Sequence, residues 1–245
     1  MTAESGPATS ASTGAEIHHE HRDVTGGWLR PTVFGAMDGL VSNFALIAGI
    51  AAGSHSNVKS IILAGFAGLG AGAFSMAAGE YVSVRSQSEL ALAEVEVERT
   101  ELERNPLAEQ EELAQLYESR GLEPELAAEV ARQLSKNKDE VLGVHAREEL
   151  GIDPSDLPSP WVASSSSLLS FAVGAFLPLL PYILGASSLL PAIIVTAAGL
   201  FLAGALVSRV TARSWWYSGL RQLIVGAIAG ALTFGLGSLV GAVGV

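Results

Sequence analysis

The sequence contains no cysteine, and only 16% of its 245 residues are charged. Without cysteine the chain has no disulfide scaffold, no thiolate zinc site and no cysteine nucleophile. Its net charge of −11 leaves no basic surface for nucleic acid, so no nucleic-acid partner is expected. There is no phosphate-binding glycine loop, and the four consecutive serines 164–167 have no histidine or aspartate nearby. We therefore predict that the protein is not an enzyme.

Acidic residues are absent from most of the chain and concentrated in one part of it. No Asp or Glu follows Asp156, whereas nineteen lie between Glu89 and Asp156. Segment 86–160 carries only seven Lys and Arg against these nineteen acids, which gives it a net charge of −12. The chain thus consists of two apolar blocks separated by an acidic polar insert.

The apolar blocks contain five long stretches that are almost free of charge. An α-helix needs about 20 apolar residues to cross about 30 Å of hydrocarbon. Five helices of that length are hard to bury in a soluble fold, so the sequence predicts an all-α, helical membrane protein with five spans. The only charged residues in these stretches are Asp38 and Glu80. The stretches are 31–53, 60–84, 163–185, 189–208 and 223–245.

The chain is accordingly divided into four parts. A tail covers residues 1–30, spans one and two lie within 31–92, the insert covers 93–160, and spans three to five lie within 161–245. The tail lacks an apolar period and is predicted to be disordered. Its three histidines at 18, 19 and 21 are either solvated side chains or a weak metal-collecting arm.

The positions of Lys and Arg predict the orientation in the membrane, because these residues gather on the cytoplasmic side. Bases precede the first span, occur throughout the insert, and lie between spans four and five as Arg209, Arg213 and Arg221. We therefore expect the amino terminus, the insert and this last loop in the cytoplasm, with membrane lipid around the spans. No targeting segment is recognisable, so the expected membrane is the plasma membrane of a bacterium, its inner membrane.

Helix signals subdivide the insert. Segment 87–104 continues span two as a helix, and Asn105 followed by Pro106 fits a cap with a first-turn proline. The helix that begins there ends before Gly121, a third runs from Pro124 to near residue 136, and a fourth covers 139–150. Apolar residues of these helices are expected to form a small core. They are Leu113, Leu116, Leu126, Val130, Leu134, Val141 and Leu142.

Two acids within the spans are the first candidates for function. An ionisable group inside a membrane span is costly and by default indicates a functional site, which points to Asp38 and Glu80. Met76 lies one helical turn before Glu80, and Asn43 with Ser42 offers further oxygens near Asp38. A thioether with carboxylates suits a divalent transition-metal ion better than Ca²⁺ or Mg²⁺. Alternatively, Glu80 lies near the membrane interface and Met76 only fills a gap.

Carboxylates of the insert are the second candidates. Glu94, Glu98 and Glu101 share one helix face, Glu109 and Glu112 pair on the next helix, and His145 pairs with Glu149 on the last, beside Glu148. Three helices could bring several carboxylates and one imidazole to a point, as bundles do when they bind metal. The alternative is a charge-rich helix face that is merely solvated.

Three stretches resemble the vacuolar iron transporter family. They are GAMDGLVSN at 35–43, FSMAAGEYVS at 74–83 and HAREELG at 145–151, and the resemblance extends from Gly27 almost to the end of the chain. It implies a five-span fold, a homodimer, and exchange of Fe²⁺, often Mn²⁺ as well, for protons. In this family the residues that match Asp38 and Met76 line a path at the dimer axis, and Glu80 belongs to the same motif as Met76.

The resemblance also implies that a cytoplasmic helical domain collects metal through glutamates. In this chain they are Glu98, Glu101, Glu109, Glu112 and Glu149. The sequence departs from the family pattern at Met37, where family members often have Asn, and at His145, near which plant-type members have methionine. An imidazole still binds divalent metal, but it could change selectivity and pH response.

Together these observations predict a proton-coupled transporter that exports Fe²⁺, and as a second candidate Mn²⁺, from the cytoplasm. No cofactor is expected to be permanently bound, because Fe²⁺, Mn²⁺ or Zn²⁺ would be the substrate and the ligand of the insert. The alternative is a membrane-anchored metal buffer or sensor, which predicts metal binding without flux. That alternative leaves Asp38 inside a span unexplained.

Overall fold

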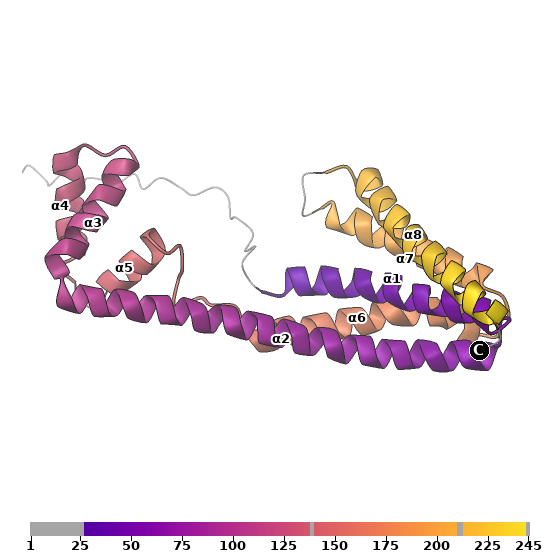
Figure 1. The fold of residues 1–245 in the computed structure, drawn as a ribbon. Helices are drawn as coiled ribbons and strands as arrows, with labels where there is room; N and C mark the ends of the chain where they lie inside the picture. The colour runs from indigo at the N-terminus through magenta and orange to yellow at the C-terminus, as the bar shows by residue number, and fades with distance from the viewer. Residues whose placement is uncertain (1–26, 138–139, 210–212, 244–245) are drawn as a thin grey trace, which may run out of the picture.

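The computed structural model describes residues 27–137, 140–209 and 213–243. The three histidines predicted to lie in a disordered tail fall outside these residues. Every regular element in the described part of the chain is a helix (Figure 1). The all-α class is therefore confirmed. The helices are α1 (Leu29–Gly53), α2 (Val58–Arg104), α3 (Pro106–Ser119), α4 (Pro124–Leu134), α5 (Val141–Glu148), α6 (Pro160–Ile183), α7 (Leu190–Val207) and α8 (Trp215–Val243).

Five of these helices, α1, α2, α6, α7 and α8, are long and apolar enough to cross a membrane. They correspond to the five predicted spans, although α8 begins at Trp215 rather than at the predicted residue 223. Large apolar side chains cover the outside of the bundle, with Leu63 73% and Phe74 72% exposed. Such a surface is unfavourable in water but suits contact with lipid chains.

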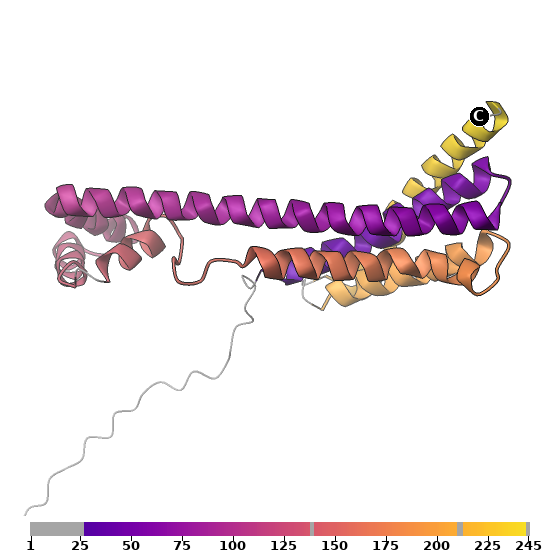
Figure 2. The same cartoon turned by 90° about the horizontal axis from the view of Figure 1, so that it is seen from below.

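Helix α2 joins the membrane bundle to the insert without a break. Its 47 residues correspond to a length of about 70 Å at 1.5 Å per residue, more than twice the thickness of the hydrocarbon core. Its second half therefore projects beyond the bundle, and α3, α4 and α5 gather around the far end (Figures 1 and 2). This arrangement confirms that span two continues as a helix into the insert.

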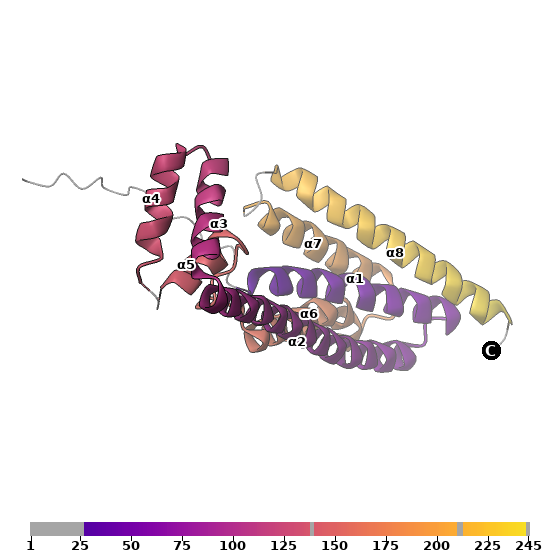
Figure 3. The ribbon, with the colours of Figure 1, turned by 60° about the vertical axis from the view of Figure 1, so that its left-hand side comes forward.

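Helix α1 occupies the centre of the bundle and packs against α6, α8 and α2, while α7 packs against α8 (Figure 3). Toward the end of the bundle away from the insert, Ile47 of α1, Ile61 of α2 and Leu179 of α6 are fully buried in one apolar cluster. The contact between α1 and α6 is close because glycines lie on both sides of it. A Cβ atom on Gly174 would lie 2.2 Å from the carbonyl oxygen of Ala36.

Gly174→Ala is therefore expected to destabilise the bundle, because the added methyl group meets backbone atoms that cannot move independently. The cost of overpacking of this kind is about 1–3 kcal/mol. Gly235→Ala is the matched control, since a Cβ there meets nothing within 4 Å and alanine favours a helix interior. Thermal unfolding of the detergent-solubilised variants should show a lower midpoint for Gly174→Ala alone. Equal midpoints would contradict the close α1–α6 contact.

A small apolar core holds the insert together. Leu113, Ala114 and Ala131 form its centre, with Leu116 and Leu134 packed against them. All three leucines were predicted to lie in this core. The prediction for Leu126 is wrong, because its side chain is 55% exposed. The buried face of α4 instead carries Ala127 and Ala131, four residues apart, and Leu126 lies about 100° around the helix from Ala127.

Candidate metal centres

Three carboxylates and one imidazole meet where α2, α3 and α5 come together. The residues are Glu98, Glu109, His145 and Glu149, and one ligand atom from each lies within 4.8 Å of the others. Nδ1 of His145 is 3.0 Å from Oε1 of Glu98 and 2.8 Å from Oε1 of Glu149. His145 is fully buried and Glu109 is 7% exposed. We call these four residues the insert cluster.

Local sequence signals bring the cluster together. Helix α2 ends at Arg104 with Asn105 as its cap, and Pro106 in the first turn of α3 lets the chain reverse direction. Glu109 then lies in the first turn of α3, where a negative charge favours the helix dipole. His145 and Glu149 are one turn apart at the end of α5, so both face α2 from the same side.

The ligand atoms of the cluster are buried and lack hydrogen-bond partners in the described chain. This holds for both ring nitrogens of His145 and for Oε1 of Glu98 and of Glu149, although these oxygens lie at ion-pair distance from Nδ1. Buried polar atoms without partners are costly, so a group of them that faces one point needs an explanation. A divalent cation bound among them would satisfy Oε1 of Glu98, Oε1 of Glu149 and one ring nitrogen of His145 at once.

The electrostatics of the cluster agree with cation binding. Burial, and next the negative charge of Glu149, raises the pKa of Glu98 to about 7. Burial, followed by the charges of Glu112 and Glu109, raises the pKa of Glu149 to about 7. Without a cation, these carboxylates therefore hold protons up to neutral pH. A bound metal ion would replace the protons and remove the repulsion.

The remaining predicted ligands of the insert lie outside this cluster. Glu94 is exposed on α2, one turn before Glu98. Oε2 of Glu101 accepts a hydrogen bond from Nδ2 of Asn105 at 3.0 Å. Glu112 is exposed and acts on Glu149 only through its charge.

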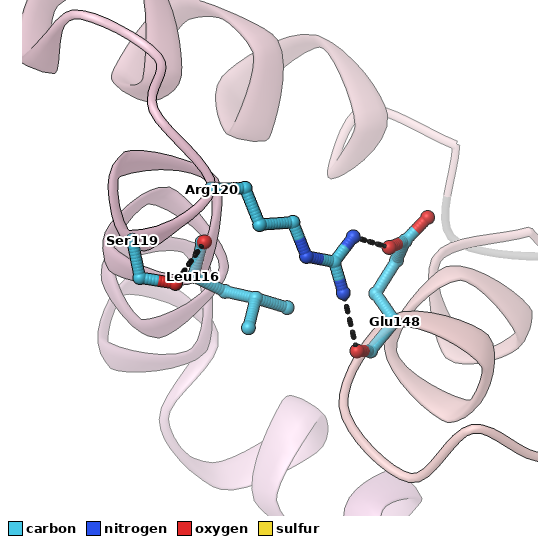
Figure 4. Close-up of polar contacts among 4 residues, drawn as sticks. All are labelled: Leu116, Ser119, Arg120 and Glu148. Carbon is cyan, nitrogen blue, oxygen red and sulfur yellow. Dashed lines mark hydrogen bonds and ion pairs between the residues drawn. The ribbon is translucent and has the colours of Figure 1, made fainter.

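Glu148, also predicted as a ligand, pairs with Arg120 at the end of α3. Figure 4 shows that the guanidinium bonds both the Glu148 carboxylate and its carbonyl oxygen, the latter at 2.8 Å from Nη2. The pair therefore links the carboxyl-terminal ends of α3 and α5, next to Glu149. Glu148 thus holds the helices that carry two of the cluster residues.

A second polar site lies inside the membrane bundle, in a cavity of about 270 Å³ between α1, α2 and α6. Asp38 and Asn43 reach it from α1 and Met76 reaches it from α2. Their assignment to a transport path stays a prediction. Asn43 is held in place by its Nδ2 atom, which donates to the carbonyl oxygen of Ala175 at 2.6 Å. Its Oδ1 atom is buried without a hydrogen-bond partner in the described chain. We call this the membrane cavity.

Glu80, the other residue predicted for the transport path, does not line this cavity. It is buried on α2, one turn nearer the insert, where α6 begins. There the ring of Tyr81 lies 4.8 Å from that of Trp161, and Ser164 Oγ donates to the carbonyl oxygen of Ala77 at 2.8 Å. Glu80 therefore lies between the insert cluster and the membrane cavity.

Ser75 and Phe171 are among the residues of the cavity wall that are absent from the predicted transport path. A signal for Ser75 exists, because it continues the face of α2 that carries Gly68 and Gly72. Phe171 comes from α6, and nothing in the sequence indicates that this helix meets α2 here. Only the packing of the described helices shows that Phe171 belongs to the cavity wall.

A five-span helical bundle with an ionisable polar cavity among its spans is typical of a membrane transport protein. Residues 29–238 match the model of the VIT family, and the chain belongs to this family. The resemblance to vacuolar iron transporters is thereby confirmed. Membership also agrees with the expectation of a protein that is not an enzyme.

Several relatives carry names that agree with this assignment. A vacuolar iron transporter of Acanthamoeba castellanii is 41% identical, over 90% of this chain and 82% of its own length. Vacuolar iron transporter 1 of Oryza sativa subsp. japonica is 31% identical over 95% of this chain and 94% of its own length. Vacuolar iron transporter 1 of Arabidopsis thaliana is 30% identical over 91% of this chain and 90% of its own length. Family and relatives support iron transport by a multi-pass membrane protein.

Proposed function

We propose that this protein exports Fe²⁺ from the cytoplasm in exchange for protons, with Mn²⁺ as a second substrate. In this proposal the insert and the amino-terminal end of α1 lie in the cytoplasm, and the membrane is a bacterial plasma membrane. The insert cluster captures the ion, and the membrane cavity passes it across the bilayer. Asp38, Asn43 and Met76 contact the ion in the cavity, and Glu80 lies on the way to it.

The observation that carries the proposal is the set of unpartnered, buried ligand atoms in the insert cluster. An exposed acidic surface would be satisfied by water, whereas His145 is fully buried and Glu98 and Glu149 have side chains only 12% and 15% exposed. An imidazole with carboxylates is a mixed nitrogen and oxygen set, which suits Fe²⁺, Mn²⁺ or Zn²⁺. The protein thus retains a costly arrangement that one divalent ion would stabilise.

Exchange for protons follows from the chemistry of the carboxylates. A metal ion and a proton compete for the same oxygen, so binding of one releases the other. Among the described residues that line the membrane cavity, only Asp38 is acidic, and Ser42 beside it donates its hydroxyl to the backbone oxygen of Asp38 at 2.6 Å. The Asp38 carboxylate is therefore left to alternate between metal and proton.

A homodimer is part of the proposal, because the membrane cavity opens on a surface that one chain leaves uncovered. Leu46 of the cavity wall is 36% exposed, and a Cβ on Gly79, on the face of α2 that lines the cavity, would meet nothing within 4 Å. Small residues allow a second helix to approach closely in a membrane. A second copy packed on this face would enclose the ion path between the two chains.

Metal affinity of the insert cluster should depend on pH around neutrality. Because the pKa values of Glu98 and Glu149 are about 7, protons compete with the ion below that pH. Affinity for Mn²⁺ measured by calorimetry is expected to fall by about tenfold or more from pH 7.5 to pH 6, since ligands must be deprotonated. An affinity that stays constant over this range would contradict the shared burial of these carboxylates.

The raised pKa values of Glu98 and Glu149 also predict how the stability of the metal-free protein depends on pH. A carboxyl whose pKa is raised on folding favours the folded state below its ordinary value, and this contribution is lost as the pH rises from about 4.5 to about 7. The metal-free protein should therefore unfold more easily at pH 7.5 than at pH 5. Added Mn²⁺ should restore the melting temperature at pH 7.5, because it binds only the folded state.

The direct test is flux in liposomes. Purified protein is reconstituted, and uptake of Fe²⁺ and of Mn²⁺ is measured with and without a pH gradient, together with the pH inside the vesicles. The proposal expects metal uptake that is driven by the gradient and accompanied by proton movement in the opposite direction. Metal binding by a folded protein without any flux would instead favour the buffer or sensor, and flux without proton movement would contradict exchange.

A further inference from the structure

A group of cations lies where α7 ends and α8 begins. Arg209 follows the end of α7, Arg213 precedes α8, and Arg221 lies in the second turn of α8. This end of the α7–α8 pair is the end at which α1 begins and from which α2 runs on to the insert (Figures 1 and 3). No acidic residue follows Asp156, so helices α6, α7 and α8 contribute arginines and no acidic side chain to this end of the bundle.

A cavity of about 500 Å³ lies between the two helices at this point. Its polar rim is formed by Ser208, Arg209, Arg213 and Ser214. Its remaining walls are apolar and come from α7 and the start of α8. They are Leu202, Ala205, Leu206 and Trp215. The volume lies within the range of about 300–1,000 Å³ that is usual for sites of small ligands.

The walls of this cavity are held in place by close helix contact below it. A Cβ on Gly204 would lie 2.5 Å from the carbonyl oxygen of Ser218, so the backbones of α7 and α8 touch. Trp215 is fixed by an edge-to-face contact with Phe201, with ring centres 5.9 Å apart. The cavity is therefore a formed feature of the bundle rather than a gap between separate helices.

The combination of a basic rim and apolar walls selects an amphiphilic anion. Arginine binds phosphate oxygens with two parallel hydrogen bonds, and two arginines here flank one opening. Leu202 and Leu206 are 60% and 61% exposed on the outer surface of α7, where acyl chains lie in a membrane. Tryptophan at this depth belongs to the interfacial zone of the bilayer. A soluble anion would use the arginines but leave the leucines without a partner.

We propose that this cavity, with Arg209 and Arg213, binds the phosphate headgroup of an anionic phospholipid in the leaflet on the insert side of the bundle. Ser208 does not donate to the phosphate, because its hydroxyl donates to the carbonyl oxygen of Ala205 at 2.6 Å. Basic pockets between spans are a recognised way to hold such headgroups. The site is separate from the proposed metal path, whose cavity lies between α1, α2 and α6.

Native mass spectrometry of the full-length protein in detergent tests the proposal. Phosphatidylglycerol and phosphatidylcholine with identical acyl chains are titrated against the wild type and three rim variants. The variants are Arg209→Gln, Arg213→Gln and the double variant that combines Arg209→Lys with Arg213→Lys. Arg221→Gln is the matched control, since it removes one charge at the same end of α8 but does not line the cavity. Size-exclusion profiles show which variants are folded. If one of the rim variants is not folded, the remaining rim variants carry the test.

We expect the wild type to prefer phosphatidylglycerol and each Gln variant at the rim to bind it about fivefold more weakly. The Lys variant should retain much of the affinity, and Arg221→Gln should change it less than twofold. Equal affinity for the two lipids would overturn the proposal. An equal loss of affinity in Arg221→Gln would also overturn it, because that result would mean diffuse attraction. Full displacement of the lipid by glycerol phosphate at the same concentration would overturn it too, because that result would mean a site for a soluble anion.

Discussion

Replacing Asp38 with alanine is expected to reduce Fe²⁺ flux at least about 100-fold in the liposome assay. No other acidic residue in the described part of the chain lines the membrane cavity, so the loss of Asp38 removes the negative charge that balances the ion there. Removing one partner of a buried charge pair costs about 3–5 kcal/mol, which corresponds to more than two factors of ten. The effect should appear for Mn²⁺ as well.

Asp38→Asn separates charge from shape at this position. It keeps an oxygen ligand and the side-chain volume but cannot exchange a proton, so residual flux through it should not respond to the pH gradient. Glu125→Gln removes an exposed charge on α4 that belongs to neither site, and it serves as the control with normal flux. Flux in Asp38→Ala equal to that of the wild type would show that the ion does not pass through this cavity.

Substitutions in the insert cluster should have an effect of similar size on binding. In the group that converges within 4.8 Å, Glu98→Gln replaces a carboxylate ligand by a neutral amide, and His145→Ala removes the imidazole ligand. Loss of an outer partner alone costs about 10–100-fold in metal affinity, so loss of a ligand should cost at least that much. Calorimetry with Mn²⁺ in an Asp38→Ala background measures the insert cluster without interference from the membrane cavity.

Glu94→Gln provides the matched control for the cluster. Glu94 lies on the same helix as Glu98 and one turn before it, and it carries the same charge, but it is exposed and outside the cluster. Its substitution should change affinity by less than twofold. If Glu94→Gln and Glu98→Gln weaken binding equally, the acidic face of α2 acts through diffuse attraction, and the four-residue site is wrong.

The membrane part of the fold could be predicted from the sequence because length and apolarity alone decide whether a helix can span a bilayer. The continuation of α2 could also be predicted, since residues 81–104 contain neither Gly nor Pro to interrupt the helix. Leu126 shows where such reasoning ends. Its apolar side chain is compatible with a core position, but the neighbouring Ala127 faces α3 and leaves Leu126 exposed.

The candidate sites were predictable in part. Helical spacing places Glu94, Glu98 and Glu101 on one face of α2, but it cannot tell which of them faces the other helices. That choice depends on where α3 folds back and on how α5 docks, which are tertiary contacts. Glu148 illustrates the same limit, because Arg120 lies 28 residues away in sequence and yet is its partner.

The unbroken α2 helix has a mechanical consequence. It carries Met76 of the membrane cavity and Glu98 of the insert cluster, 22 residues or about 33 Å apart on one rigid rod. A helix without a kink acts as a lever, so a tilt of about 10° at the cavity displaces the far end by about 6 Å. A displacement of that size would separate Glu98 from the ligands on α3 and α5. Metal binding at the insert cluster and opening of the membrane cavity would then be parts of a single movement.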